Sequence, residues 1–115
     1  MANTFKTITK ANVTTLDTIY TVASSTTTVI IGLILGNTTT SQITSTVTIA
    51  SDTANRAGNN DEANQTVEAL TNGPIPAGGS LEILSGGKVV LETTDELKVS
   101  ASGSCDIILS VMEIT

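Results

Sequence analysis

The sequence has no histidine and no tryptophan, and it has only one cysteine, one phenylalanine and one tyrosine. Without histidine, the usual general base of a catalytic triad and the commonest metal ligand are missing. One thiol, Cys105, can form neither an intrachain disulfide nor a multi-thiolate zinc site. Cys105 opens an apolar stretch, where a free cysteine usually packs as a small hydrophobic side chain. These absences favour a structural or binding module over an enzyme.

Positive charge is also scarce. Five Lys and Arg stand against eleven Asp and Glu, which gives a formal net charge of −6. Because nucleic-acid phosphates are bound by clustered basic residues, these scattered ones exclude nucleic acid as a partner. The most apolar run, from Val29 to Leu35, is too short to cross a bilayer. The first residues show no apolar leader segment either, so we expect no membrane partner.

No phosphate-binding, dinucleotide-binding or nucleophile-elbow motif is present. The adjacent acidic pairs Asp61-Glu62 and Asp95-Glu96 are the remaining candidates for carboxylate chemistry or Ca²⁺ binding. Neither pair has the spacing of an EF-hand loop. Neighbouring residues of a strand point to opposite faces, and acidic residues in turns are usually solvated. We therefore expect no enzymatic activity, no cofactor and no metal site, with weak Ca²⁺ binding left open.

Threonine is abundant instead, at 22 of 115 residues, mostly between valines, isoleucines and leucines. A β-branched side chain loses rotamer freedom in a helix but packs well on a pleated sheet. Apolar residues alternate with period two between short polar turns, and no useful helix pattern appears. At this length the pattern predicts a single all-β domain, residues 1–115, built as a two-sheet antiparallel β-sandwich of about eight strands. Strand order stays open between a jelly roll, which we prefer, and an Ig-like fold.

The expected strands are residues 4–9, 16–23, 27–36, 43–50, 64–71, 81–84, 89–91, 97–101 and 105–114. Phe5 is expected to anchor the first of them. The stretches 27–36 and 105–114 are apolar on both faces. For 27–36 this indicates a strand covered on both sides, and for 105–114 it indicates a central strand. A Gly-containing turn at residues 85–88 predicts that 81–84 and 89–91 form a hairpin.

Two stretches are candidates for contact with another subunit. One face of strand 43–50 carries Thr44, Thr46 and Thr48, which could hydrogen-bond or pack across a flat interface. Simple exposure to water is the alternative for each of these threonines. The second stretch, residues 74–76, should be extended and near a sheet edge, because prolines fix φ and donate no ladder hydrogen bond. Its candidate residues are Pro74, Ile75 and Pro76.

The N-terminal segment and one long loop complete the candidates. Residues 2–10, with Phe5, Lys6 and Lys10, could dock as an edge strand on a neighbouring subunit or an acidic surface. They could equally be the first strand of the domain's own sheet. Residues 51–63 contain no large apolar side chain and are expected to form an exposed loop. Its candidate ligand-binding residues are Asp52, Asn55, Arg56, Asn59, Asn60 and Asp61.

Four segments in order carry a resemblance to a known group of proteins. They are TIYTV at 18–22, PIPAGGSLEIL at 74–84, GKVVLETTDELKV at 87–99 and SVMEI at 110–114. In this order they resemble small virion structural proteins of tailed bacteriophages, especially marine and cyanobacterial ones. The likeness covers most of the chain except residues 51–65. At residues 93–96 the chain departs from the Pro- or Gly-containing turn that is common in that family.

The resemblance implies a non-enzymatic subunit on the exterior of a phage virion, made in the host cytoplasm. Its implied role is to decorate or cement the capsid through self-association, with a trimer favoured, and through contacts to the major capsid protein. The alternative is a neck, tail or fibre module that attaches there or binds a receptor or glycan.

Overall fold

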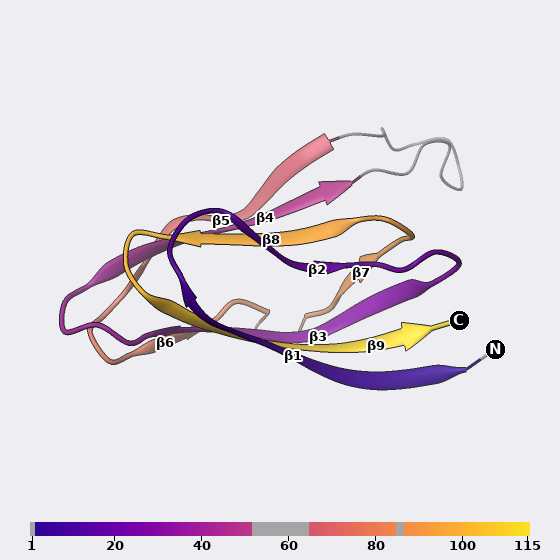
Figure 1. The fold of residues 1–115 in the computed structure, drawn as a ribbon, viewed down its shortest axis with the longest axis horizontal. Helices are drawn as coiled ribbons and strands as arrows, with labels where there is room; N and C mark the ends of the chain where they lie inside the picture. Colours follow the sequence, from indigo (N-terminus) through magenta and orange to yellow (C-terminus); the bar gives the residue numbers. More distant parts are fainter. Residues whose placement is uncertain (1, 52–64, 85–86) are drawn as a thin grey trace.

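The computed structural model describes residues 2–51, 65–84 and 87–115. They form β-strands in two facing layers (Figure 1). The strands are β1 (Asn3–Val13), β2 (Asp17–Thr21), β3 (Thr27–Asn37), β4 (Ile43–Ser51), β5 (Gln65–Ile75), β6 (Ser80–Glu82), β7 (Val89–Leu91), β8 (Glu96–Ala101) and β9 (Cys105–Ile114). Each expected strand has a counterpart. In this part of the chain there is no helix suited to crossing a membrane.

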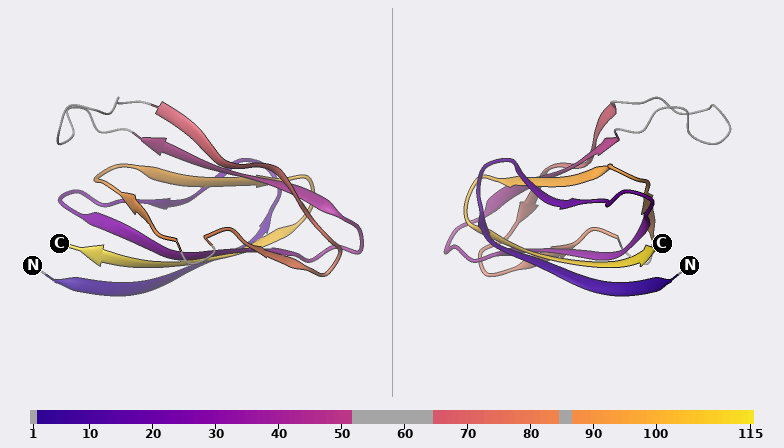
Figure 2. Two further views of the ribbon diagram at one scale, coloured as in Figure 1. Left: turned by 180° about the vertical axis from the view of Figure 1, so that it is seen from behind. Right: turned by 45° about the vertical axis from the view of Figure 1, so that its right-hand side comes forward.

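The strands form two antiparallel sheets, which the side views separate clearly (Figure 2). Sheet A has the order β1-β9-β3-β6, with β7 also paired to β3, and sheet B has the order β2-β8-β4-β5. The pairs are nested in the sequence: β4 with β5, β3 with β6 and β7, β2 with β8, and β1 with β9. One long hairpin folded over into two layers produces this nesting, which is the jelly-roll arrangement. The preference for a jelly roll is confirmed.

The strands β6 and β7 lie one after the other along β3 and do not pair with each other. β6 pairs with residues 34–36 of β3, and β7 pairs with residues 28–30. The hairpin predicted between them is therefore wrong. An isolated hairpin of such short strands is only marginally stable. Each strand gains hydrogen bonds by pairing with the free edge of the long strand β3 instead.

The core lies between the two sheets and is almost entirely aliphatic. Its fully buried side chains include Leu33, Leu35, Val47, Leu97, Val99, Ile107 and Leu109. Cys105 is buried among them, as expected, and burial raises the pKa of its thiol. Phe5, which is expected to anchor the first strand, points to the outside of sheet A and is 71% exposed, so it does not anchor that strand through the core.

Asn37 joins the end of β3, the loop that follows it and the end of β5 at one end of the sandwich. Its buried side-chain amide donates to the backbone carbonyls of Ser41, Ile75 and Pro76, at 2.8, 3.0 and 3.1 Å. Its side-chain oxygen accepts from the backbone N–H and the hydroxyl of Thr39. One buried amide thus fixes the β3–β4 loop against the end of β5, because all of its hydrogen-bonding capacity is used.

Candidate interaction surfaces

The outer face of sheet A is apolar. In a two-layer sandwich each sheet has one covered face, so a strand that is apolar on both faces must expose one of them. β9 is central in sheet A, between β1 and β3, as expected. The expectation that residues 27–36 are covered on both sides is wrong, since Ile31 and Ile34 are 39% and 37% exposed. On β9, Ile108 is 44% exposed.

One continuous row of apolar residues crosses four strands of this face. Phe5 on β1 is opposite Met112 on β9, Met112 is opposite Val29 on β3, and Val29 is opposite Val90 on β7. Residues directly opposite each other in adjacent strands share a face of the sheet. The two ends of the row are the most open, with Phe5 71% and Val90 59% exposed.

A second apolar group lies beside that row. Ile108 is opposite Ile34 in the register of β9 and β3. Between the two rows, a register shift around residues 30–32 of β3 places Ile31 and Gly32 opposite Ser110, as in a β-bulge. We call the whole set the apolar face; its members are Phe5, Val29, Ile31, Ile34, Val90, Ile108 and Met112.

The apolar face is large; the row from Phe5 to Val90 carries no charge, whereas the row of Ile108 and Ile34 ends at Glu82 on β6. The exposed parts of its side chains amount to roughly 500 Å², in the upper range for a patch on a monomer and a size often associated with function. Four of its polar neighbours on β1 and β9 are uncharged, namely Asn3, Thr7, Thr9 and Ser110. Acidic side chains, Glu82 and Asp106, occur toward one end of it, in register with Ile34 and Gly36.

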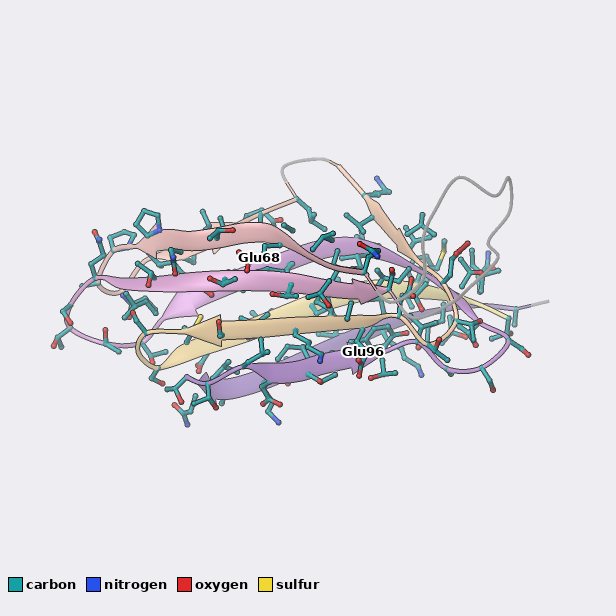
Figure 3. The ribbon with its side chains drawn as sticks, turned by 90° about the horizontal axis from the view of Figure 1, so that it is seen from above. Glu68 and Glu96 are labelled. Atoms are coloured by element: carbon teal, nitrogen blue, oxygen red, sulfur yellow. The ribbon has the colours of Figure 1, made fainter. Side chains whose placement is uncertain are left out.

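The outer face of sheet B has the opposite character. Figure 3 looks onto this face, where Glu68 and Glu96 lie on different strands. Lys98 lies within 3.8 Å of Glu96, and the Thr21 hydroxyl contacts the same carboxylate at 3.5 Å. Charged and hydroxyl side chains of this kind are well solvated, so this face has no need of a partner.

The three threonines of β4 were predicted to form an accessible face. They do lie on the outer side of sheet B, but Thr48 is only 6% exposed, because it lies between Glu68 of β5 and Lys98 of β8. That part of the prediction is wrong. Thr44 and Thr46 are half-buried, and the Thr46 hydroxyl accepts a hydrogen bond from the Asn72 N–H at 3.0 Å. Only Thr44 and Thr46 retain surface that a partner could contact.

The segment 74–76 is divided between surface and core. β5 is an edge strand of sheet B, as expected, and Pro74 and Pro76 are exposed. Ile75 is fully buried opposite Ile43, so its prediction as a contact residue is wrong. Side chains alternate along a strand, and the exposed prolines on either side direct Ile75 into the core.

The N-terminal segment forms β1, the edge strand of sheet A, paired along its length with β9. Lys6 and Lys10 alternate with Phe5 and project to the inner side at the margin of the sandwich. There Lys6 forms an ion pair with Glu113 at 2.9 Å, and Lys10 pairs with Asp17 of β2 at 3.3 Å. Lysines at such positions protect an exposed edge against pairing with other strands. Both charges are therefore paired within the fold, and Phe5 alone of the three points to the outer face of sheet A.

A polar cluster closes the sandwich near β1. The Tyr20 hydroxyl of sheet B donates to the Glu113 carboxylate of sheet A and contacts the Thr28 hydroxyl at 2.8 Å. Hydrogen bonds from Tyr20 and Lys6 lower the pKa of the Glu113 carboxyl. Burial, together with Glu113, raises the pKa of Tyr20 to about 12. Sequence reasoning missed this cluster, because its members are far apart in the chain.

The remaining candidates give no site among the described residues. The loop candidates Asp52, Asn55, Arg56, Asn59, Asn60 and Asp61 lie outside the described residues, as does Glu62. Asp95 is buried and accepts a hydrogen bond from the Glu92 N–H at 3.0 Å, so the expectation of a solvated turn residue is wrong. Across residues 2–51, 65–84 and 87–115 we find no pocket and no cluster of three or more metal-ligating side chains.

Comparison with known proteins adds information on the fold. No protein-family model matches the chain, and no curated protein matches it. A chain in the structure of the infectious bursal disease virus Gx strain is similar, with a TM-score of 0.57 and 15% identity, over 96% of this chain and 32% of that one. This likeness agrees with the jelly-roll topology and extends to the fold alone.

Two further solved structures overlap less closely. A chain of the T13 viral particle of the same virus gives a TM-score of 0.48 at 13% identity, covering 96% of this chain and 35% of that one. A chain of Bacillus endospore appendages, described as disulfide-linked pili, gives 0.48 at 16% identity, covering 99% and 87%. The protein thus spans about a third of the viral chains and most of the appendage chain.

Proposed function

We propose that this protein is a non-enzymatic structural subunit of a tailed-phage virion that decorates or cements the outside of the capsid. The apolar face of sheet A is the observation that carries the proposal. The central part of a protein–protein interface is depleted of charge and enriched in aromatic residues and methionine. Phe5, Met112 and the surrounding aliphatic side chains have this composition, on one face of a sheet that can pack against another protein.

The fold and the sequence resemblance both support this proposal. A jelly roll is a frequent architecture of viral structural proteins, and the solved structure with the higher overlap is that of a virus. The order of the segments at 18–22, 74–84, 87–99 and 110–114 adds the phage assignment. We propose contacts to the major capsid protein and to further copies of the chain, on the exterior of a particle assembled in the host cytoplasm.

Immunogold labelling of intact phage particles tests the location directly. Antibodies raised against the purified chain should label the head surface of the phage that encodes it. Labelling restricted to the neck, tail or fibres would overturn the capsid location and support the alternative of an attachment or receptor-binding module. Absence of the chain from purified particles, checked by mass spectrometry, would overturn the virion assignment altogether.

A matched pair of variants tests the surface. Val90→Lys places a charge on the apolar face, whereas Thr18→Lys places the same charge on the outer face of sheet B. We expect Val90→Lys to reduce incorporation into particles at least tenfold and Thr18→Lys to leave it unchanged. Equal incorporation of both variants would show that the apolar face makes no contact on the particle.

A further inference from the structure

We propose that the apolar face binds the same face of a second copy, so that two chains stack sheet A against sheet A about a twofold axis. This inference deepens the proposed function, because it names the partner of the same surface. It does not depend on where the protein lies on a particle.

The size of the face suits a dimer. A stable interface commonly buries about 800 Å² on each partner. The roughly 500 Å² of apolar surface would supply about 60% of that area, a proportion found in interfaces between identical subunits. Asn3, Thr7 and Thr9 border the apolar rows on the edge strand β1, and together with Ser110 between the rows they can supply the rest.

Charge favours a second copy over a partner of another kind. The chain carries a net charge of −6, so two copies repel each other over most of their surfaces. The row from Phe5 to Val90 is free of charge, and there two acidic chains can meet without repulsion. A basic partner would find carboxylates only toward one end of the face, at Glu82 and Asp106.

Those two carboxylates also decide how the copies are oriented. With the twofold axis along the strands, the acidic ends of both copies would coincide and repel. With the axis across the strands, Glu82 and Asp106 of one copy lie toward the opposite end of the other, where the uncharged residues Asn3, Ile114 and Thr27 are in register. We therefore infer a dimer in which each strand of sheet A runs opposite to the equivalent strand of the other copy.

A twofold dimer also needs fewer different contact patches on each copy than a trimer does. A closed ring of three requires two different complementary patches on every copy, whereas a twofold contact requires one self-complementary patch. The other large apolar side chains exposed among the described residues are Leu16 and Val67, and neither belongs to the face. The trimer implied by the resemblance thus has no second patch in the described part of the chain.

Solution mass measured by light scattering at several protein concentrations tests the proposal. The full chain should give twice the 11.8 kDa of one copy. Ile108→Lys should weaken the dimer more than about 100-fold, because one added charge from each copy would be buried in the interface. Thr18→Lys, on the outer face of sheet B, should leave the dimer intact. Circular dichroism confirms that each variant is folded, and Val90→Lys replaces Ile108→Lys if the latter does not fold.

Each other outcome overturns the twofold pairing in a recognisable way. A mass of three copies would replace it with a ring and leave self-association in place. A monomer at all concentrations, combined with labelling of particles by the antibody, would assign the apolar face to another virion protein and leave the proposed function standing. A dimer lost in Thr18→Lys but kept in Ile108→Lys would move the contact to sheet B.

Discussion

Tyr20 and Glu113 join the two sheets of the sandwich through a hydrogen bond between residues that are far apart in the sequence. Glu113 also pairs with Lys6 on β1, and the Tyr20 hydroxyl contacts Thr28 on β3. The four side chains therefore connect β1, β2, β3 and β9 at one margin. In a chain with an almost purely aliphatic core, this cluster supplies directional contacts between the layers, which fix their relative position.

Replacing Tyr20 with phenylalanine should lower the free energy of unfolding by about 1–2 kcal/mol. The variant keeps the ring but leaves the buried Thr28 hydroxyl without this partner and removes one donor to Glu113. Urea unfolding followed by circular dichroism measures the change. Thr21→Ala on the exposed side of the same strand is the control and should change stability by less than about 0.5 kcal/mol. Equal stability of Tyr20→Phe and the parent chain would contradict the structural role of this hydroxyl.

Alkaline titration should give Tyr20 a pKa of about 12 in the folded protein, since burial and the neighbouring carboxylate disfavour the phenolate. The unfolded value is about 10. Because the folded pKa is raised, the associated stability is complete below about pH 10 and is lost as pH rises through about 12. The chain has one tyrosine and no tryptophan, so phenolate absorbance reports this residue alone. The same titration in denaturant is the control, and coincident midpoints would refute the prediction.

Acid should destabilise the protein partly through Glu113. Hydrogen bonds from Tyr20 and Lys6 lower its folded pKa below the unfolded value of about 4.3. Its contribution is therefore present above about pH 4.3 and is lost as pH falls through the folded pKa. We expect the free energy of unfolding of Glu113→Gln to fall less steeply below this pH than that of the parent chain. Parallel pH profiles would show that the carboxylate is not stabilised in the fold.

Ile75 and Pro74 are neighbours that should respond very differently to replacement by alanine. Ile75→Ala removes a fully buried side chain and should cost about 2–5 kcal/mol in unfolding free energy. Pro74→Ala affects an exposed side chain on an edge strand and should cost less than about 1 kcal/mol. Thermal unfolding of the two variants side by side measures the difference. Similar midpoints would place Ile75 at the surface, as the sequence alone suggested.

Much of the local structure could be predicted because period-two alternation and β-branched residues act within a few residues of each other. All the expected strands are found, and the lone cysteine is buried as a small hydrophobic side chain. The partners of short strands could not be predicted in this way. β6 and β7 both extend β3, because a long strand with an open edge offers each of them more hydrogen bonds than they can offer each other.

For the candidate surface, too, the sequence determined one part and the tertiary structure another. The composition of residues 27–36 and 105–114 determined that both sides of β3 and β9 are apolar. Only the tertiary structure decided which of those sides is covered, because a two-layer sandwich buries a single face of each sheet. The packing of the layers buries Leu33 and Leu109 and leaves Ile34 and Ile108 open. It also places Phe5 and Val90, far apart in sequence, at the ends of one exposed row, since that row exists only where four strands are in register.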